Sequence, residues 1–226
     1  MINEIKEYLE KNATNNYKEF SSKLIKTKYP ILGIRTPILR DLAKKIVKDN
    51  YKLFLEENDY SYYELVLLEA FVIGKAKMNS EELFYYLDRF IPLIENWAVH
   101  DGLVSSLKIT KKIQDEMLNY LNKYITSKKE YEVRFVALML MSYYLEDKYI
   151  NIAFEIINKL YLVDYYSKMG VAWFLATAAI KYPDLVYNYL NYSRDIELKR
   201  MTVRKLRDSF RIDDKYKEMI LKTIRS

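Results

Sequence analysis

Glycine and proline are scarce in this chain, with only four of each among 226 residues. That is too few to supply the turns of an all-β fold, in which short strands alternate with Gly- and Pro-rich connections. Apolar residues instead recur every three or four positions, the period of an α-helix, as in the stripe Val133, Val136, Ala137, Met139 and Leu140. No Ser- or Gly-rich linker interrupts the chain. We therefore expect an all-α fold and one domain over residues 1–226.

Three similar segments in the second half of the chain indicate an internal repeat. They are Arg134–Leu138, Met169–Trp173 and Arg200–Arg204, whose starts lie 35 and 31 residues apart. We expect each segment to open a helix that a second, shorter helix follows, because helix pairs repeating at this length are typical of HEAT and armadillo solenoids. Such a stack has a concave face that can carry a long ligand. A plain helical bundle is the alternative.

The residue inventory excludes several classes of function. The absence of cysteine rules out disulfides, iron–sulfur clusters and thiol nucleophiles, and the single histidine argues against a histidine-based metal site or a Ser–His triad. The chain has no Walker A loop, dinucleotide-binding glycine motif, nucleophile elbow or HExxH motif. Its first residues are charged, and its longest apolar run, Gly170–Ile180, is shorter than a membrane span. We expect a cytoplasmic protein that uses no cofactor or metal and contacts no membrane.

Positive charge is concentrated near the C-terminal end. The whole chain has 37 Lys and Arg against 31 Asp and Glu, a formal net charge of +6. At helical spacing, Arg200, Arg204, Arg207 and Arg211 form one continuous face, which only Asp208 interrupts. A solvated helix face usually mixes both signs of charge. This face therefore favours a polyanion, such as nucleic acid, as the partner of the protein. We expect the protein to be monomeric.

The sequence around each of the two tryptophans predicts a different environment for its side chain. Trp97 precedes Asp101 by four residues, so a helix would place the indole and the carboxylate on the same face, one turn apart. An unpaired carboxylate in an apolar setting is costly, so core packing does not explain this pair well. For Trp173, core packing is the simpler interpretation. We expect His100 to be a partly buried polar residue at a helix edge and assign it no role.

With these residues, the chain resembles the AlkD family of DNA alkylation repair proteins. The resemblance rests on the string ILGIRTPILRDLAKKI near residue 31, on the Trp97–Asp101 pair, on Arg134 and on Trp173 ten residues before Pro183. It runs through nearly the whole chain. It implies a right-handed, curved stack of about six HEAT-like repeats with a concave face that cradles duplex DNA. The family's substrates are N3- and N7-alkylated purines.

The same resemblance implies roles for individual residues. Asp101 matches the essential carboxylate, and Trp97 and Trp173 match residues that contact the sugar and backbone at the lesion, so we expect these three residues to form the catalytic site. Departure of a cationic alkylpurine leaves an oxocarbenium-like sugar, which a nearby carboxylate stabilises. The family needs no metal for this reaction. We expect the remaining DNA contacts from Arg35, Arg134, Tyr165, Tyr166, Lys168, Arg200 and Arg204.

Some departures from the family pattern leave other functions open. The second N-terminal helix has Leu24 where glycosylase members have an aromatic residue, with Tyr17 and Phe20 nearby but out of register. A tyrosine pair precedes Trp173 where Phe is expected, and the sequence at Trp97 is NWAVHD rather than a double Trp. We expect a monofunctional DNA glycosylase that excises cationic alkylpurines. The alternatives are a non-catalytic protein of the same fold that binds branched DNA, and a protein-interaction scaffold.

Overall fold

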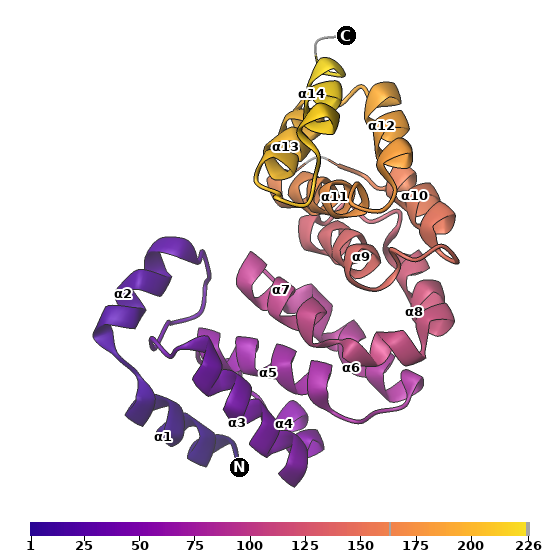
Figure 1. Ribbon diagram of the computed structural model, residues 1–226. Coiled ribbons are helices and arrows are strands. Elements are labelled where there is room, and N and C mark those ends of the chain that lie inside the picture. Colours follow the sequence, from indigo (N-terminus) through magenta and orange to yellow (C-terminus); the bar gives the residue numbers. More distant parts are fainter. Residues whose placement is uncertain (163, 225–226) are drawn as a thin grey trace. The chain divides into compact units, whose positions relative to one another are not determined.

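The computed structural model describes residues 1–162 and 164–224 (Figure 1). These residues form α-helices, short 3-10 helices and connecting loops, with no strand among them. The predicted all-α fold is thus confirmed for this part of the chain. No helix within it has both the length and the apolar content needed to cross a membrane. The chain divides into two compact units, Met1–Met117 and Leu118–Ser226, so the expectation of a single domain stays a prediction.

A row of three packed helices forms the centre of the first unit. The helices are α1 (Ile2–Asn12), α2 (Asn15–Leu24), α3 (Thr36–Asp49), α4 (Tyr51–Glu57), α5 (Tyr63–Lys75), α6 (Ser80–Phe90) and α7 (Trp97–Ser106), with 3-10 turns η1 (Ile91–Leu93) and η2 (Lys108–Lys112). α5 packs against α3 on one side and α7 on the other, while α4 contacts α3 and α6 contacts α5. Every residue of α5 from Tyr63 to Gly74 is buried, which explains why its sequence is apolar apart from Glu64 and Glu69.

Two glycines allow α5 and α7 to pack closely. A Cβ atom on Gly74 would lie 2.3 Å from the Cβ of Ser106, so any larger residue would push the two helices apart. A Cβ on Gly102 would lie 3.0 Å from the ring of Phe71. The close contact fixes how far the ends of α5 and α7 stand from each other. It therefore positions the polar residues at both ends of α7.

The second unit contains a second row of three packed helices. Its elements are η3 (Asn122–Tyr124), α9 (Glu130–Tyr143), α10 (Ile150–Lys159), α11 (Tyr165–Ala178), α12 (Pro183–Tyr192), α13 (Ile196–Arg207) and α14 (Asp214–Lys222), and α8 (Gln114–Leu121) contains the boundary between the units. α11 packs between α9 and α13, with α12 against α11 and α14 against α13. In both units a long central helix is therefore followed by a shorter one.

The repeat spacing predicted from the sequence is confirmed, but the predicted helix starts are one turn late. The three helices that contain the repeated segments begin at Glu130, Tyr165 and Ile196, which are again 35 and 31 residues apart. Each start lies four residues before the segment that marked it. The first turn of a helix is rich in polar residues because its backbone N–H groups have no partner inside the helix, so the apolar pattern begins later. The shorter following helices α10, α12 and α14 are present as predicted.

The continuous arginine face predicted near the C-terminus is wrong at its last member. α13 ends at Arg207, and Arg211 lies in the turn before α14. Arg200, Arg204 and Arg207 remain on α13 and are exposed. Neither glycine nor proline marks this helix end, so the sequence contains no strong stop signal there.

A buried carboxylate holds the LGIRTP segment that precedes α3. Glu64, only 1% exposed, accepts hydrogen bonds from the backbone N–H groups of Leu32 at 3.0 Å, Gly33 at 2.8 Å and Ile34 at 3.3 Å. Gly33 has φ of +98°, and a Cβ there would lie 2.5 Å from backbone atoms of α2 and its N-cap. Only glycine fits this position without strain. The segment is thus held by hydrogen bonds to a side chain of α5 and by close packing against α2.

A second buried carboxylate in the first unit makes stability depend on pH. Burial raises the pKa of Glu69 to about 7, although Asn58 and Tyr60 donate hydrogen bonds to it. The folded pKa exceeds the ordinary value of 4.5. The contribution to stability is therefore fully present below pH 4.5 and is lost as pH rises through about 7. We expect Glu69→Gln to reduce the fall in melting temperature between pH 5 and pH 8. An unchanged fall in the variant would show that other groups cause it.

Candidate functional site

The first part of the site is the N-terminal end of α7, where Trp97 is the first helical residue. The Asn96 side chain caps the helix by accepting a hydrogen bond from the Val99 N–H at 3.1 Å. Asn96 is itself buried, so this helix start is fixed rather than frayed. The Trp97 side chain remains 36% exposed. A rigid helix end therefore presents an indole to solvent.

Asp101 lies one turn further along α7, as predicted, with 26% of its side chain exposed. Its Oδ1 atom is 2.8 Å from Nδ1 of the fully buried His100. A carboxylate can only accept a hydrogen bond, so an ionised Asp101 requires the hydrogen to be on Nδ1. The imidazole thus fixes the orientation of a carboxylate that still reaches solvent. Consecutive helical residues do not normally face each other, which is why the sequence did not reveal this contact.

The loop before α7 is tied to the segment that follows α2. Glu95 accepts hydrogen bonds from the Thr27 hydroxyl and the Lys28 N–H, both at 2.7 Å, and pairs with the Lys28 ammonium at 3.3 Å. These bonds connect residues 68 and 67 positions apart in the sequence. α2 itself is weakly buried, and its apolar residues Phe20 and Leu24 are 55% and 50% exposed. The anchored end of α2 is therefore held beside the start of α7.

In the second unit, Arg134 of α9 is inside the protein rather than on its surface. It is 1% exposed, and its Nη1 donates a hydrogen bond to the Tyr166 carbonyl oxygen at 3.2 Å. Its guanidinium carbon lies 5.3 Å from the centre of the Trp173 ring and 5.8 Å from that of Tyr166. Gly170 leaves room for it, since a Cβ there would be 3.3 Å from Arg134 Cγ. Arg134 thus packs against Tyr166 and Trp173 of α11 from the interior of the protein.

Trp173 is the second aromatic residue that the sequence selected, and it lies between two cations in a partly exposed position. Besides Arg134, the Lys205 ammonium of α13 lies 5.3 Å from its ring centre, a cation–π contact. Its indole N–H is buried and has no hydrogen-bond partner within the described residues. A cavity of about 330 Å³ adjoins the ring and is also lined by Met141, Lys205 and Ser209. Trp173 therefore borders an open space rather than a filled core.

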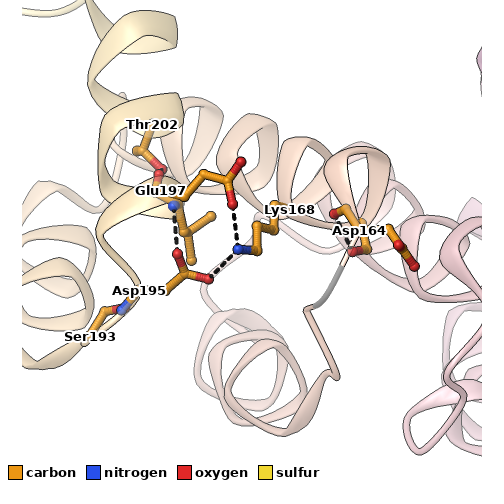
Figure 2. Close-up of polar contacts among 8 residues, drawn as sticks. Asp164, Lys168, Ser193, Asp195, Glu197 and Thr202 are labelled. Carbon is orange, nitrogen blue, oxygen red and sulfur yellow. Dashed lines mark hydrogen bonds and ion pairs between the residues drawn. The ribbon is translucent and has the colours of Figure 1, made fainter.

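Lys168 of α11, predicted to contact DNA, is held by two carboxylates (Figure 2). Its ammonium is 3.2 Å from Asp195 and 2.6 Å from Glu197 at the start of α13, and its side chain is only 13% exposed. The hydrogen bond to Glu197 raises its pKa. Asp195 also caps α13 by accepting from the Leu198 N–H at 2.9 Å. Lys168 therefore fixes α13 against α11, and a contact with DNA stays a prediction.

The other predicted DNA contacts differ in their exposure. Arg35 at the start of α3 and Arg200 and Arg204 on α13 are exposed, as a phosphate-binding side chain must be. Tyr165 is 53% exposed and packs edge-on against Tyr166, with the ring centres 5.1 Å apart. These exposed side chains are accessible to a ligand. Arg134 and Lys168, in contrast, are mostly buried and contact neighbouring protein residues.

The structure groups the predicted residues in two sets. Trp97 and Asp101 share one face of α7 in the first unit. Arg134 contacts both Tyr166 and Trp173 in the second. Sequence reasoning missed His100 and Lys205, which touch the most important residue of each set.

No cluster of three or more His, Asp or Glu side chains suited to a metal ion occurs among the described residues. A search of curated proteins finds no match. A family model does match, however, and covers residues 5–208. It describes DNA alkylation repair enzymes. The match extends over the LGIRTP segment, the Trp97–Asp101 helix and the Arg134–Trp173 cluster, which are the features that carried the resemblance. The chain therefore belongs to the family of DNA alkylation repair enzymes.

Proposed function

We propose that this protein is a monofunctional DNA glycosylase that excises cationic N3- and N7-alkylated purines from duplex DNA. The observation that carries the proposal is the partly exposed Asp101 carboxylate, one helical turn from the exposed Trp97, in a chain of the alkylation repair family. Alkylation at N3 or N7 makes the purine a cationic leaving group, so no strong general acid is required. This chemistry suits a site with one carboxylate and no metal cluster among the described residues.

Asp101 would act by stabilising the positive charge that develops on the sugar. At about 4 Å and an effective dielectric constant of about 20, the attraction is on the order of 4 kcal/mol. His100 keeps the carboxylate in one orientation, which avoids reorganisation during the reaction. The Trp97 indole would pack against the sugar–phosphate backbone and exclude water. The charge on Asp101 and the position of Trp97 thus have separate roles.

The second unit would supply binding rather than chemistry. Trp173 borders a cavity and keeps a free indole N–H among the described residues, which suits a contact with the DNA backbone. Lys205 beside it and the exposed Arg200 and Arg204 on α13 add positive charge. Phosphate contacts of this kind give affinity without sequence preference. Arg134 and Lys168 would support this surface by fixing α11.

The proposal includes a fold of about six HEAT-like repeats. Each central helix from α3 to α13 is followed by a shorter helix, which gives the pairs α3–α4, α5–α6, α7–α8, α9–α10, α11–α12 and α13–α14. Within each unit the central helices pack in chain order. This arrangement supports a repeat architecture whose central helices carry the expected site residues, with Arg35 at the N-cap of α3. A right-handed curved stack would then offer those helices to one ligand.

The test is incubation with a duplex that carries a single 7-methylguanine, followed by detection of the free base and of the abasic site. We expect the free base to be released and the strand to break only after treatment with alkali, because a monofunctional glycosylase leaves the backbone intact. Strand cleavage without alkali would contradict this mechanism. Tight binding of a four-way junction with no base release would instead favour a non-catalytic DNA-binding protein.

A further inference from the structure

A second basic surface lies at the opposite end of α7 from Trp97. A cavity of about 800 Å³ is formed where α5 and α7 end and η2 begins, and α3 contributes one side chain to it. Five cations line this cavity, and no Asp or Glu does. They are Arg40, Lys75, Lys77, Lys108 and Lys112. None of the seven residues that the sequence selected for DNA contacts lies here.

The cations of this cavity are not neutralised by the protein. None of the five has an ion pair within residues 1–162 and 164–224, whereas the nearby Lys44 is paired with Asp41 at 2.8 Å. Burial, followed by the charges of Arg40, Lys44 and Lys108, lowers the pKa of Lys75. Like charges held together without a counterion destabilise a fold. Such a cluster favours the binding of an anion from outside the described chain.

Arg40 is held in place with its charge directed to this cluster. Its guanidinium carbon lies 4.2 Å above the ring centre of the buried Phe71, and Nη1 donates a long hydrogen bond of 3.5 Å to the Ser106 hydroxyl. A guanidinium has five N–H donors in a planar fork that matches phosphate oxygens. The close approach of Gly74 to Ser106 brings Lys75 to the same place. The cavity is therefore built by helix packing and does not arise from loose surface lysines alone.

The stripe of residues along α7 connects this cavity to the proposed catalytic carboxylate. Trp97, Asp101 and Ser105 follow one another at four-residue spacing, so they lie along one side of α7, and Lys108 begins η2 just after the helix ends. Ser106, which lines the cavity and ends α7, is five residues after Asp101, about 7.5 Å along the helix at 1.5 Å per residue. That length equals about two base-pair steps of duplex DNA at about 3.4 Å each.

We propose that the Arg40–Lys75–Lys108–Lys112 cavity binds backbone phosphodiesters of the duplex, at least about two nucleotides from the alkylated base. The volume accommodates more than one phosphate group, and consecutive phosphates carry the repeated negative charge that five clustered cations attract. The cavity thus holds the flanking backbone while Asp101 acts at the lesion. The placement relative to the lesion rests on the proposed glycosylase function, and phosphodiester binding itself does not.

The first test measures affinity for an undamaged duplex as a function of salt, so it does not depend on base excision. The variant Lys75→Gln/Lys108→Gln/Lys112→Gln removes three charges from the cavity. The control Lys11→Gln/Lys45→Gln/Lys159→Gln removes three charges from lysines that are exposed elsewhere. We expect the cavity variant to bind about tenfold more weakly at low salt, with a salt slope lower by about 0.9 for each lost phosphate contact. The melting temperature of this variant should be unchanged or higher, because repulsion is relieved.

Equal affinity and equal salt slope for the cavity variant and its control would overturn the proposal. If the triple variant fails to fold, the exposed Lys108→Gln substitution alone is tested by the same two measurements, affinity and salt slope.

The second test places single uncharged methylphosphonates along a duplex that contains 7-methylguanine. The wild-type protein should lose affinity at positions two to four nucleotides from the lesion on one side, and the cavity variant should not. Position-independent losses would refute the placement.

Discussion

Replacing Asp101 by Asn is expected to slow base excision about a thousandfold under single-turnover conditions, while DNA affinity changes by no more than about twofold. The charge contributes on the order of 4 kcal/mol to the transition state, which corresponds to roughly a thousandfold in rate. Asn retains an oxygen that can accept the hydrogen bond from His100 Nδ1. The shape and the packing of α7 should therefore remain, and only the negative charge is lost. An effect on the transition state alone lowers the rate and not the affinity.

A structural role for Asp101 leads to a different result. If the carboxylate mainly held His100 in the fold, the Asn variant would melt at a lower temperature and lose binding and excision together. Asp49→Asn on α3, an exposed aspartate, is the matched control and should leave all three quantities unchanged. Melting temperature, affinity and excision rate must therefore be measured on the same preparation. Wild-type excision by a well-folded Asn variant would refute the catalytic assignment.

Replacing Glu64 by Gln is expected to destabilise the protein by about 3 kcal/mol. The carboxylate accepts three backbone N–H groups, two of them through Oε1 and one through Oε2. A glutamine has only one oxygen, so its NH₂ group would face a backbone N–H and leave a buried donor unsatisfied. The loss of hydrogen bonds to a charged group adds to this cost. The melting temperature should fall by about 6–12 °C for a chain of this size.

The Glu64→Gln variant should also bind DNA more weakly, because Arg35 follows the segment that Glu64 holds. The matched control is Glu7→Gln on α1, an exposed glutamate, which should melt at the wild-type temperature. Thermal unfolding followed by circular dichroism measures both variants. A Glu64→Gln protein with wild-type melting temperature would show that the LGIRTP segment does not depend on this carboxylate.

Features that depend on local spacing could be predicted from the sequence. The helical period gave the all-α fold, and the four-residue interval placed Trp97 and Asp101 on one face of α7. The repeat interval was correct because the buried pattern of each central helix recurs. The predicted helix starts were one turn late because the first turns of these helices are polar and lack the apolar period.

Contacts between distant residues could not be predicted in the same way. Glu64 and the LGIRTP segment are about 30 residues apart, and Lys168 meets Glu197 across 29 residues. The DNA contact of Arg134 stays a prediction, but the sequence did not reveal that the space beside Gly170 lets its side chain pack against Trp173. The cavity lined by Arg40, Lys75 and Lys108 combines side chains from three segments. No single stretch of sequence shows that these charges meet.

Under the proposed function, this protein removes purines that are already cationic, with a carboxylate that stabilises the sugar. The most direct measurement compares single-turnover base release from two duplexes that differ only in one residue, 7-methylguanine or the uncharged hypoxanthine. We predict release of 7-methylguanine and no detectable release of hypoxanthine, because only the first leaves without a general acid. Equal release of both bases, or release of neither, would contradict the account.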